Sequence, residues 1–394
     1  MTSLSDLKVL DLGSALAAPY AAMMLADLGA EVIKIEKPRR GDLIRFTDRY
    51  VGGESGYFLG INRGKDSVTV DVRVEEGRRI IREMAKDADI LIENFRSKRM
   101  VEWGLSYEDL KPLNPRLIYC SISGFGDIPG YEDTGGNDIV AQAYSGIMDI
   151  TGDADGGPAK TGAPVVDVMA GMLATSGILA ALHRRDVTGE GDHVRVNLLE
   201  AAYALMPNYV VSVLNGTPNF RRCGSGHPQL VPYQAFLAAD GRYVVVGVFH
   251  TASWQGFCDA IERPDLMNDP RFKENADRVT NRAELAAIIQ EIIQTKPADH
   301  WVAMFKERDL LASPVLTIDE SFRTFSAARE DLVVSLPHST LGELKMLRVP
   351  IHSRQAPASP SRASPTLGEH TEARLSEMGL DAATLNALRE KRVI

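Results

Sequence analysis

The chain has 394 residues, more than a single hydrophobic core usually accommodates, which predicts two domains or one large domain with an excursion. A hydrophobic content of 44% and a charged content of 25% are ordinary for a globular protein and exclude a disordered or fibrous chain. The formal net charge of -9 disfavours non-specific binding to nucleic acid or to an anionic membrane.

The cysteines and the apolar segments indicate in which cellular compartment the protein is found. Cys120, Cys223 and Cys258 lie far apart without C-x-x-C spacing, so neither a disulfide framework nor a zinc site is indicated. The first residues, MTSLSDLKVLDLG, lack the basic and apolar regions of a secretory signal. The apolar stretch VMAGMLATSGILAAL is short for a bilayer span and is better interpreted as a buried helix. We therefore expect a cytoplasmic protein.

The first elements in chain order predict a βαβ unit. Residues 7–13 (LKVLDLG) have the pattern of a buried strand, residues 17–30 that of a helix stopping at Gly29, and residues 31–36 (EVIKIE) that of a second strand. Such a unit implies a parallel sheet with its ligand crevice at the carboxyl ends of the strands, lined here by residues 13–17. Strand and helix patterns keep alternating through residue 126, which predicts an α/β fold.

The composition of the chain changes after two helices, which we predict around residues 168–183 and 197–214. The stretch 215–234 is rich in glycine, proline and polar residues, and we place a domain boundary there. Residues 235–249 then predict a hairpin that turns at Asp240 and Gly241, followed by helical segments of a smaller α/β domain.

The opening βαβ unit lacks the dinucleotide fingerprint, because the turn after Gly13 reads SALAAP without further glycines. Cations nevertheless follow the second strand at Lys37 and precede the third at Arg63 and Lys65. Each of these cations could simply lie on a solvent-exposed face or in an ordinary polar turn. Taken together, they suggest a ligand that carries several phosphates.

Asp167 lies at the predicted start of the long small-residue helix. An aspartate in this place is most often a helix N-cap. The helix dipole would also favour an ionised carboxylate there, while apolar neighbours reduce its hydration, and these conditions suit a carboxylate nucleophile. The histidines and serines form none of the common hydrolase or metalloenzyme motifs, which leaves those classes without support.

Several separated segments resemble one family, the class III CoA-transferases, which includes formyl-CoA transferase, carnitine CoA-transferase and related acyl-CoA racemases. The opening segment up to GDLIR, then NRGKDSVTVDV, ILIENF, SISGFG, NDIVAQAYSGIMDITG, GAPVVDVMAGM, TGEGDHV and the terminal PTLGEHT occur in the family's order and spacing. The resemblance covers nearly the whole chain, and as a series these segments are highly specific.

The resemblance implies a Rossmann-like large domain built from both chain ends, a smaller α/β domain between them, and two interlocked subunits in a homodimer. On that layout we expect a large domain over residues 1–205, a linker over 206–225, a small domain over 226–319 and a C-terminal return over 320–394. The resemblance also implies that Asp167 attacks an acyl-CoA thioester, with CoA as a substrate and no permanently bound cofactor or metal. The positions expected to bind CoA are Leu16, Ala17, Lys37, Arg63, Lys65, Asn94, Phe95 and Arg99, and those expected to line the active site are Asn137, Asp138, Gly224, Ser225 and Gly226.

Two departures from the family pattern narrow the activity. Leu16 replaces the glutamine of formyl-CoA transferase, which argues against an oxalate-type acceptor, and the segment Gly224–Ser225–Gly226 has fewer glycines than the mobile loop of some transferases. We expect succinyl-CoA or a similar donor and a small organic acid as acceptor.

Two alternatives stay open. Acyl-CoA racemases carry a histidine at the position of Asn137, and an asparagine cannot shuttle a proton near neutral pH, so a racemase would need another base. The other alternative is a catalytically silent CoA-binding protein, against which the intact Asp167 argues.

Overall fold

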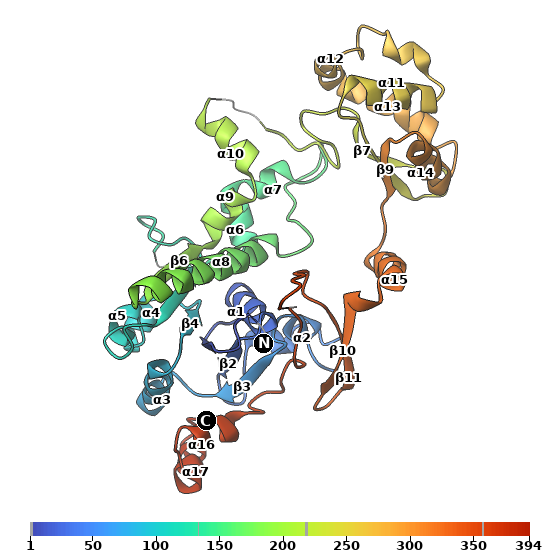
Figure 1. Ribbon diagram of the computed structural model, residues 1–394. Helices are drawn as coiled ribbons and strands as arrows, with labels where there is room; N and C mark the ends of the chain where they lie inside the picture. The colour runs from blue at the N-terminus through green and yellow to red at the C-terminus, as the bar shows by residue number, and fades with distance from the viewer. Residues whose placement is uncertain (1–2, 133, 217–219, 357) are drawn as a thin grey trace. The chain divides into compact units, whose positions relative to one another are not determined.

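The computed structural model describes residues 3–132, 134–216, 220–356 and 358–394 (Figure 1). The chain forms two compact units, the first from residues 1–145, 162–207 and 329–394 and the second from residues 146–161 and 208–328. The sequence predicts residues 146–161 in the large domain and residues 320–328 in the C-terminal return to it, whereas both segments group with the second unit. The segment 146–161 joins the second unit because Arg222 pairs with Asp149 and the Gly224 amide donates to the Gly152 carbonyl.

The first unit is built on a six-stranded parallel sheet of strand order β3-β2-β1-β4-β5-β6. The order reverses between β1 and β4, and such a reversal opens a crevice at the carboxyl ends of the strands. This architecture confirms the predicted α/β class. The strands are β1 (Lys8–Asp11), β2 (Glu31–Glu36), β3 (Lys65–Thr69), β4 (Ile90–Glu93), β5 (Ile118–Ser123) and β6 (Asp192–Asn197).

Helices surround this sheet, and the longest, α8 (Val165–Thr188), packs on α1 (Ala17–Asp27), β5 and β6 (Figure 1). The chain ends in a hairpin and two short helices. The remaining elements of the unit are α2 (Gly56–Ile61), α3 (Glu75–Lys86), α4 (Ser97–Glu102), α5 (Tyr107–Leu110), α6 (Asp138–Ser145), α9 (Leu198–Ala204), α16 (Thr371–Glu377), α17 (Ala382–Glu390), the 3₁₀ turns η1 (Leu43–Phe46) and η3 (Glu330–Leu332), and strands β10 (Val333–His338) and β11 (Gly342–Leu347).

Helix α8 approaches α1 closely at a glycine. A Cβ atom on Gly171 would lie 2.8 Å from the carbonyl oxygen of Ala17 and 2.9 Å from the ring of Tyr20, so only glycine fits this contact. By length and composition α8 could cross a membrane, yet Ala170, Ala174 and other residues of one face are buried in this unit. We interpret it as a core helix, as the sequence predicts.

Two fully buried lysines fix the turn between β1 and α1. The Nζ atom of Lys65 lies 2.7 Å from Asp11 Oδ2 and donates to the Pro19 carbonyl at 2.8 Å. The Nζ atom of Lys34 lies 3.8 Å from the same Asp11 oxygen and donates to the Gly13 carbonyl at 2.8 Å. Burial lowers the pKa of Lys65 to about 8, and it would lower that of Lys34 too, but nearby carboxylates raise the latter to about 12. Both lysines therefore act as charged clamps at neutral pH.

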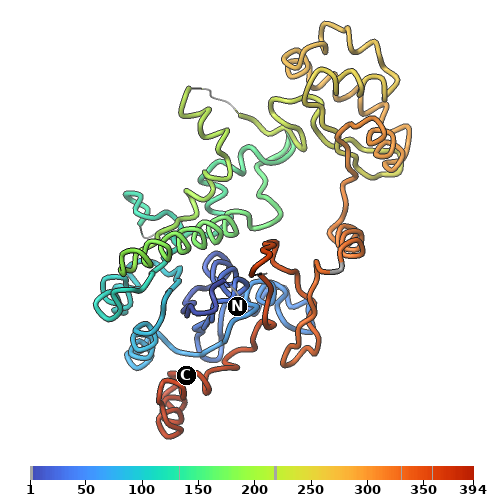
Figure 2. The backbone as a smooth tube through the Cα atoms, in the orientation of Figure 1, coloured from blue at the N-terminus to red at the C-terminus, as the bar shows by residue number. Residues whose placement is uncertain are grey.

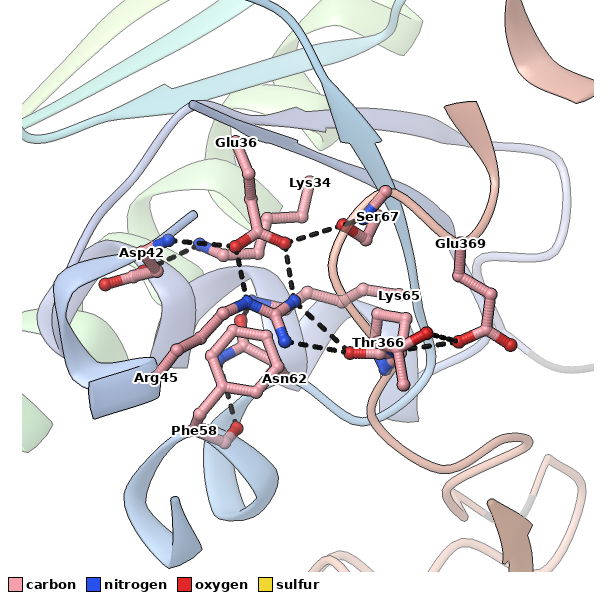
Figure 3. A network of polar contacts seen from close by, with 12 residues as sticks. Lys34, Glu36, Asp42, Arg45, Phe58, Asn62, Lys65, Ser67, Thr366 and Glu369 are labelled. Atoms are coloured by element: carbon pink, nitrogen blue, oxygen red, sulfur yellow. Dashed lines mark hydrogen bonds and ion pairs between the residues drawn. The ribbon is translucent and has the colours of Figure 1, made fainter. Parts of the chain in front are cut away.

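Two carboxylates, one at the end of β2 and one after it, extend this network (Figure 3). Glu36 accepts from Ser67 and from Arg45, whose Nη2 atom lies 2.6 Å from Glu36 Oε1. Asp42 lies 3.0 Å from the Lys34 ammonium and accepts from the Ala15 amide at 3.1 Å. Ala15 has a φ of 63°, a left-handed conformation that costs free energy for alanine and that this hydrogen bond helps to hold.

The C-terminal segment lies along the edge strand β3 (Figure 2). The Val393 carbonyl accepts from the Asp71 amide at 2.8 Å, and the Ser67 carbonyl accepts from the His370 amide at 2.9 Å. Arg374 also pairs with the buried Asp66 of β3. These contacts cover an edge that would otherwise expose unpaired backbone groups.

The second unit contains a three-stranded antiparallel sheet, β7 (Tyr233–Leu237), β8 (Tyr243–Gly247) and β9 (Leu311–Pro314). The pairing of β7 with β8 confirms the predicted hairpin. Aromatic side chains, among them Trp254, Phe257 and Phe305, fill the core of this unit. Its helices are α7 (Ile147–Ile150), α10 (Pro207–Leu214), α11 (Thr251–Ala260), α12 (Asn275–Thr280), α13 (Arg282–Ile293), α14 (Ala298–Glu307) and α15 (Ile318–Ala328), with the 3₁₀ turn η2 (Pro264–Met267).

Replacing Gly171 with alanine tests the α1–α8 contact. We expect Gly171→Ala to destabilise the fold by about 1–3 kcal/mol, because the new methyl group meets backbone rather than a flexible side chain. The control, Gly60→Ala, adds a methyl group to helix α2 where nothing lies within 4 Å, and should be neutral or slightly stabilising. Urea unfolding of both variants measures the difference, and equal stabilities would contradict the close contact.

Candidate active site

A cavity of about 260 Å³ opens at the carboxyl ends of β1, β4 and β5, and all of its lining residues belong to the first unit. This is the crevice that the sheet order predicts. It is lined by Ala15, Leu16, Ala17, Asn94, Phe95, Arg96, Ser97, Ile122, Ser123, Gly124, Phe125, Glu132, Thr134, Gly135, Gly136, Asn137, Asp167 and Leu198. The structure thus brings Leu16, Ala17, Asn94, Phe95, Asn137 and Asp167 together, as the sequence predicts.

Asp167 lies in the first turn of α8 but is not its N-cap. The helix begins at Val165, and the N-cap position is Pro164, whose side chain cannot cap. The Oδ1 atom of Asp138 caps this turn, accepting from the Val166 amide at 2.9 Å and more weakly from the Asp167 amide at 3.4 Å. The N-cap interpretation of Asp167 is therefore wrong, and the Asp167 carboxyl is free to face the cavity.

Burial, and secondly the charge of Asp138, raise the pKa of Asp167 to about 7. The sequence argument had expected the helix dipole to favour the ionised form, but desolvation outweighs it here. A carboxyl with a pKa near 7 is ionised in a large fraction at neutral pH while it stays poorly hydrated. Such a group can attack an electrophilic carbonyl carbon.

The turn after β1 is held from the side of β4 by Asn94. The Nδ2 atom of Asn94 donates to the Ser14 carbonyl at 2.7 Å, and its Oδ1 atom accepts from the Ser14 amide at 2.9 Å. This pair of bonds presents Ala15, Leu16 and Ala17 to the cavity. Asn94 is thus a positioning residue for the turn.

Two glycines allow a close backbone contact in another wall of the cavity. A Cβ atom on Gly124 would lie 2.7 Å from the Cα atom of Gly136, so the two backbones cross in direct contact. The segment from Gly124 to Gly136 thus closes on itself at these two glycines. Directly after it, Asn137 caps α6 through its Oδ1 atom, which accepts from the Val140 amide at 3.1 Å.

A narrow slot of about 140 Å³ lies beside the cavity and shares Phe95 with it. Val70, Val72, Phe95 and Trp103 give it apolar walls. Its charged lining residues are Glu36, Lys37, Asp71 and Arg73, and Arg73 pairs with Asp71. The rings of Phe95 and Trp103 meet edge to face at 5.1 Å. A flat aromatic group next to phosphates would match these walls and cations.

A larger cavity of about 780 Å³ lies over β4, β5 and β6 and has an acidic lining. Its carboxylates are Glu93, Glu108, Asp127 and Glu200. Arg195, also in the lining, pairs with Asp127. Burial raises the pKa of Glu93 to about 7. This surface disfavours a polyanionic ligand.

Several residues predicted to bind CoA lie outside the cavity and the slot. Lys65 is buried against Asp11, as described above, and Arg63 is buried with its Nε atom 3.1 Å from Asp27 Oδ1. Both cations already have carboxylate partners. Arg99 is exposed on α4 and pairs with Glu102. Gly224, Ser225 and Gly226 belong to the second unit, and their part in the site stays a prediction.

The sequence argument missed two groups of residues. Arg96 and Glu132 line the cavity, and Arg73 and Trp103 line the slot. Arg96 directly follows Asn94 and Phe95, so its position in the ENFR segment could have indicated it. Tyr57 was also missed: burial, with the charges of Asp167 and Asp138 adding to it, raises its pKa to about 12. No pattern in the sequence points to that tyrosine.

The sequence profile of CoA-transferase family III matches residues 4–371 of the chain. The chain therefore belongs to CoA-transferase family III, which confirms the predicted resemblance. Within the described residues, no group of three or more histidine, cysteine or acidic side chains is placed to hold a metal ion.

Named relatives are similar over most of their length. The chain is 34% identical to the succinyl-CoA:glutarate CoA-transferase of Mus musculus, covering 96% of this chain and 87% of the relative. It is 36% identical to the succinyl-CoA:mesaconate CoA-transferase of Haloarcula hispanica, with 98% of each covered. Among solved structures, a CAIB/BAIF family protein from Brucella suis matches with a TM-score of 0.85 and 34% identity over 96% of this chain and 99% of that one.

Asp138 variants test the local electrostatics of Asp167. Asp138→Asn keeps an oxygen acceptor for the helix amides but removes the charge, so the pKa of Asp167 should fall below 7 and stay above that of an ordinary aspartate, because burial remains. Carbon-13 NMR of labelled aspartate, assigned with Asp167→Asn, follows this titration.

Asp138→Ala removes both the negative charge and the oxygen that caps α8. The pKa of Asp167 should again fall, and the loss of the cap should lower the free energy of unfolding by about 1 kcal/mol. An Asp167 pKa that is unchanged in both variants would contradict the coupling.

Proposed function

We propose that the protein transfers CoA from succinyl-CoA or a similar donor to a small carboxylic acid, with Asp167 as the covalent acyl acceptor. The observation that supports this most directly is the Asp167 carboxyl itself. It lies in a cavity at the ligand-binding edge of the sheet, poorly hydrated and with a pKa of about 7. Membership of the CoA-transferase family supplies the reaction class.

In the first half of the reaction, the Asp167 carboxylate attacks the thioester carbonyl of the donor. The C–S bond breaks, giving an aspartyl mixed anhydride and the CoA thiolate. The thiolate then attacks the aspartyl carbonyl carbon, which releases the donor acid as a carboxylate and leaves an aspartyl-CoA thioester.

In the second half, the acceptor carboxylate attacks this thioester and forms a new anhydride with release of the thiolate. The thiolate then attacks the acceptor's acyl carbon, giving the new acyl-CoA and the free Asp167 carboxylate. Each step transfers one acyl group, and no net proton transfer is required.

In the proposed binding mode, CoA runs along Phe95, which lines both the slot and the cavity. In this arrangement the adenine ring enters the slot beside Val72 and Trp103, with Lys37 near the phosphates. The thioester reaches Asp167 in the cavity. The acidic lining of the 780 Å³ cavity supports this choice, because CoA carries several negative charges.

The relatives named for glutarate and mesaconate support a small dicarboxylic acid as the acceptor. The racemase alternative lacks a base at this position. The side-chain oxygen of Asn137 caps α6, and an asparagine cannot accept a proton near neutral pH. We further propose a cytoplasmic homodimer without a resident cofactor, and without a nucleic-acid or membrane partner.

Trapping of the covalent intermediate tests this function. After incubation with succinyl-CoA, hydroxylamine should modify Asp167, as read by peptide mass spectrometry, and Asp167→Asn should lose at least about 1,000-fold in transfer rate. The control, Asp186→Asn, changes an exposed carboxylate of the same helix and should keep both labelling and rate.

Labelling of a different carboxyl would exclude Asp167 as the acyl acceptor. Exchange of the α proton with solvent without acyl transfer would favour a racemase, and binding of CoA without any turnover would favour a silent binding protein.

A further inference from the structure

We propose that Arg96 binds the distal carboxylate of a dicarboxylic acyl group while the other end reacts at Asp167. The inference rests on the proposed function and adds a residue that selects the substrate. It makes the enzyme specific for dicarboxylic over monocarboxylic acids, in the donor acyl-CoA as well as in the acceptor.

Position is the first argument. Arg96 is the N-cap residue of α4 and lines the same cavity as Asp167. Among the described residues of that lining, Arg96 is the cationic one. Its neighbour on the helix, Arg99, pairs with Glu102, whereas none of the ion pairs found among the described residues involves Arg96. Its guanidinium is therefore available to a ligand.

The packing of the guanidinium is the second argument. A Cβ atom on Gly135 would lie 3.2 Å from Arg96 Nη2, so the guanidinium rests against the open face of this glycine. The neighbouring Gly136 is fixed by its backbone contact with Gly124. A methyl group at position 135 would shift the guanidinium by a few tenths of an ångström. The glycine thus leaves room for the Arg96 side chain at the cavity.

Charge balance is the third argument. The cavity already contains the carboxyl groups of Asp167 and Glu132. A second carboxylate on the acyl group would be repelled there unless a cation compensates, whereas a methyl group needs no such partner. Arginine offers a planar pair of donors that matches a carboxylate in a bidentate way. In the proposed binding mode, the phosphates of CoA have Lys37 at the slot as their cation.

The test compares succinyl-CoA with butyryl-CoA, which replaces the distal carboxylate by a methyl group. We expect Arg96→Met to lower kcat/KM for succinyl-CoA by about 10- to 100-fold and to change that for butyryl-CoA by less than about twofold. Arg96→Lys should give an intermediate loss, because it keeps the charge without the planar fork. Gly135→Ala should shift the same ratio in the same direction by a smaller factor, because the new methyl group displaces the guanidinium only slightly.

Arg79→Met is the control, since it removes an exposed arginine on α3, and it should leave the ratio unchanged. An equal loss for both thioesters in Arg96→Met would assign Arg96 to the CoA moiety and overturn the proposal, as would an unchanged ratio in all three test variants. Hydroxylamine labelling of Asp167 with butyryl-CoA in the same variants shows whether the proposed reaction itself still proceeds. This labelling distinguishes a failure of the Arg96 proposal from a failure of the proposed reaction at Asp167.

Discussion

The contact between α1 and α8 is the constraint on which the site depends. Gly171 of α8 lies against the carbonyl oxygen of Ala17, in the first turn of α1. Asp167 stands one helical turn before that glycine, so the contact places its carboxyl beside the turn at residues 15–17. The position of Asp167 in the cavity therefore depends on how closely these two helices pack.

Charge is distributed unevenly around this contact. On the β1–β2 side, Asp11 pairs with the buried Lys65 and Glu36 with Arg45, so these carboxylates are neutralised and fix the shape of the turn. Asp167 is desolvated too, but its strongest charged neighbour is another carboxylate, Asp138. Asp11 and Glu36 are more deeply buried than Asp167. Desolvation thus gives rigid structure where a cation pairs with the carboxylate, and a raised pKa where the neighbouring charge is another carboxylate.

Much of the fold follows from sequence periodicity, including the βαβ opening, α8 and the β7–β8 hairpin. The site was predictable where its signals are local or shared with the family, as for Leu16, Asn94 and Asp167. The burial of Lys65 was not, because its sequence shows a charge but not the carboxylate that pairs with it. The capping of α8 by Asp138, 29 residues earlier in the chain, likewise depends on tertiary packing.

The most direct measurement for the role of Asp167 is the release of succinate in a single turnover with succinyl-CoA and no acceptor acid. If Asp167 is the acyl acceptor, each active site releases up to one succinate in a burst as the aspartyl-CoA thioester forms, and the burst rate rises with pH through a midpoint near 7, because only the ionised carboxyl attacks. A burst that is absent before acceptor is added, or a midpoint near the pKa of an ordinary aspartate, would contradict this role.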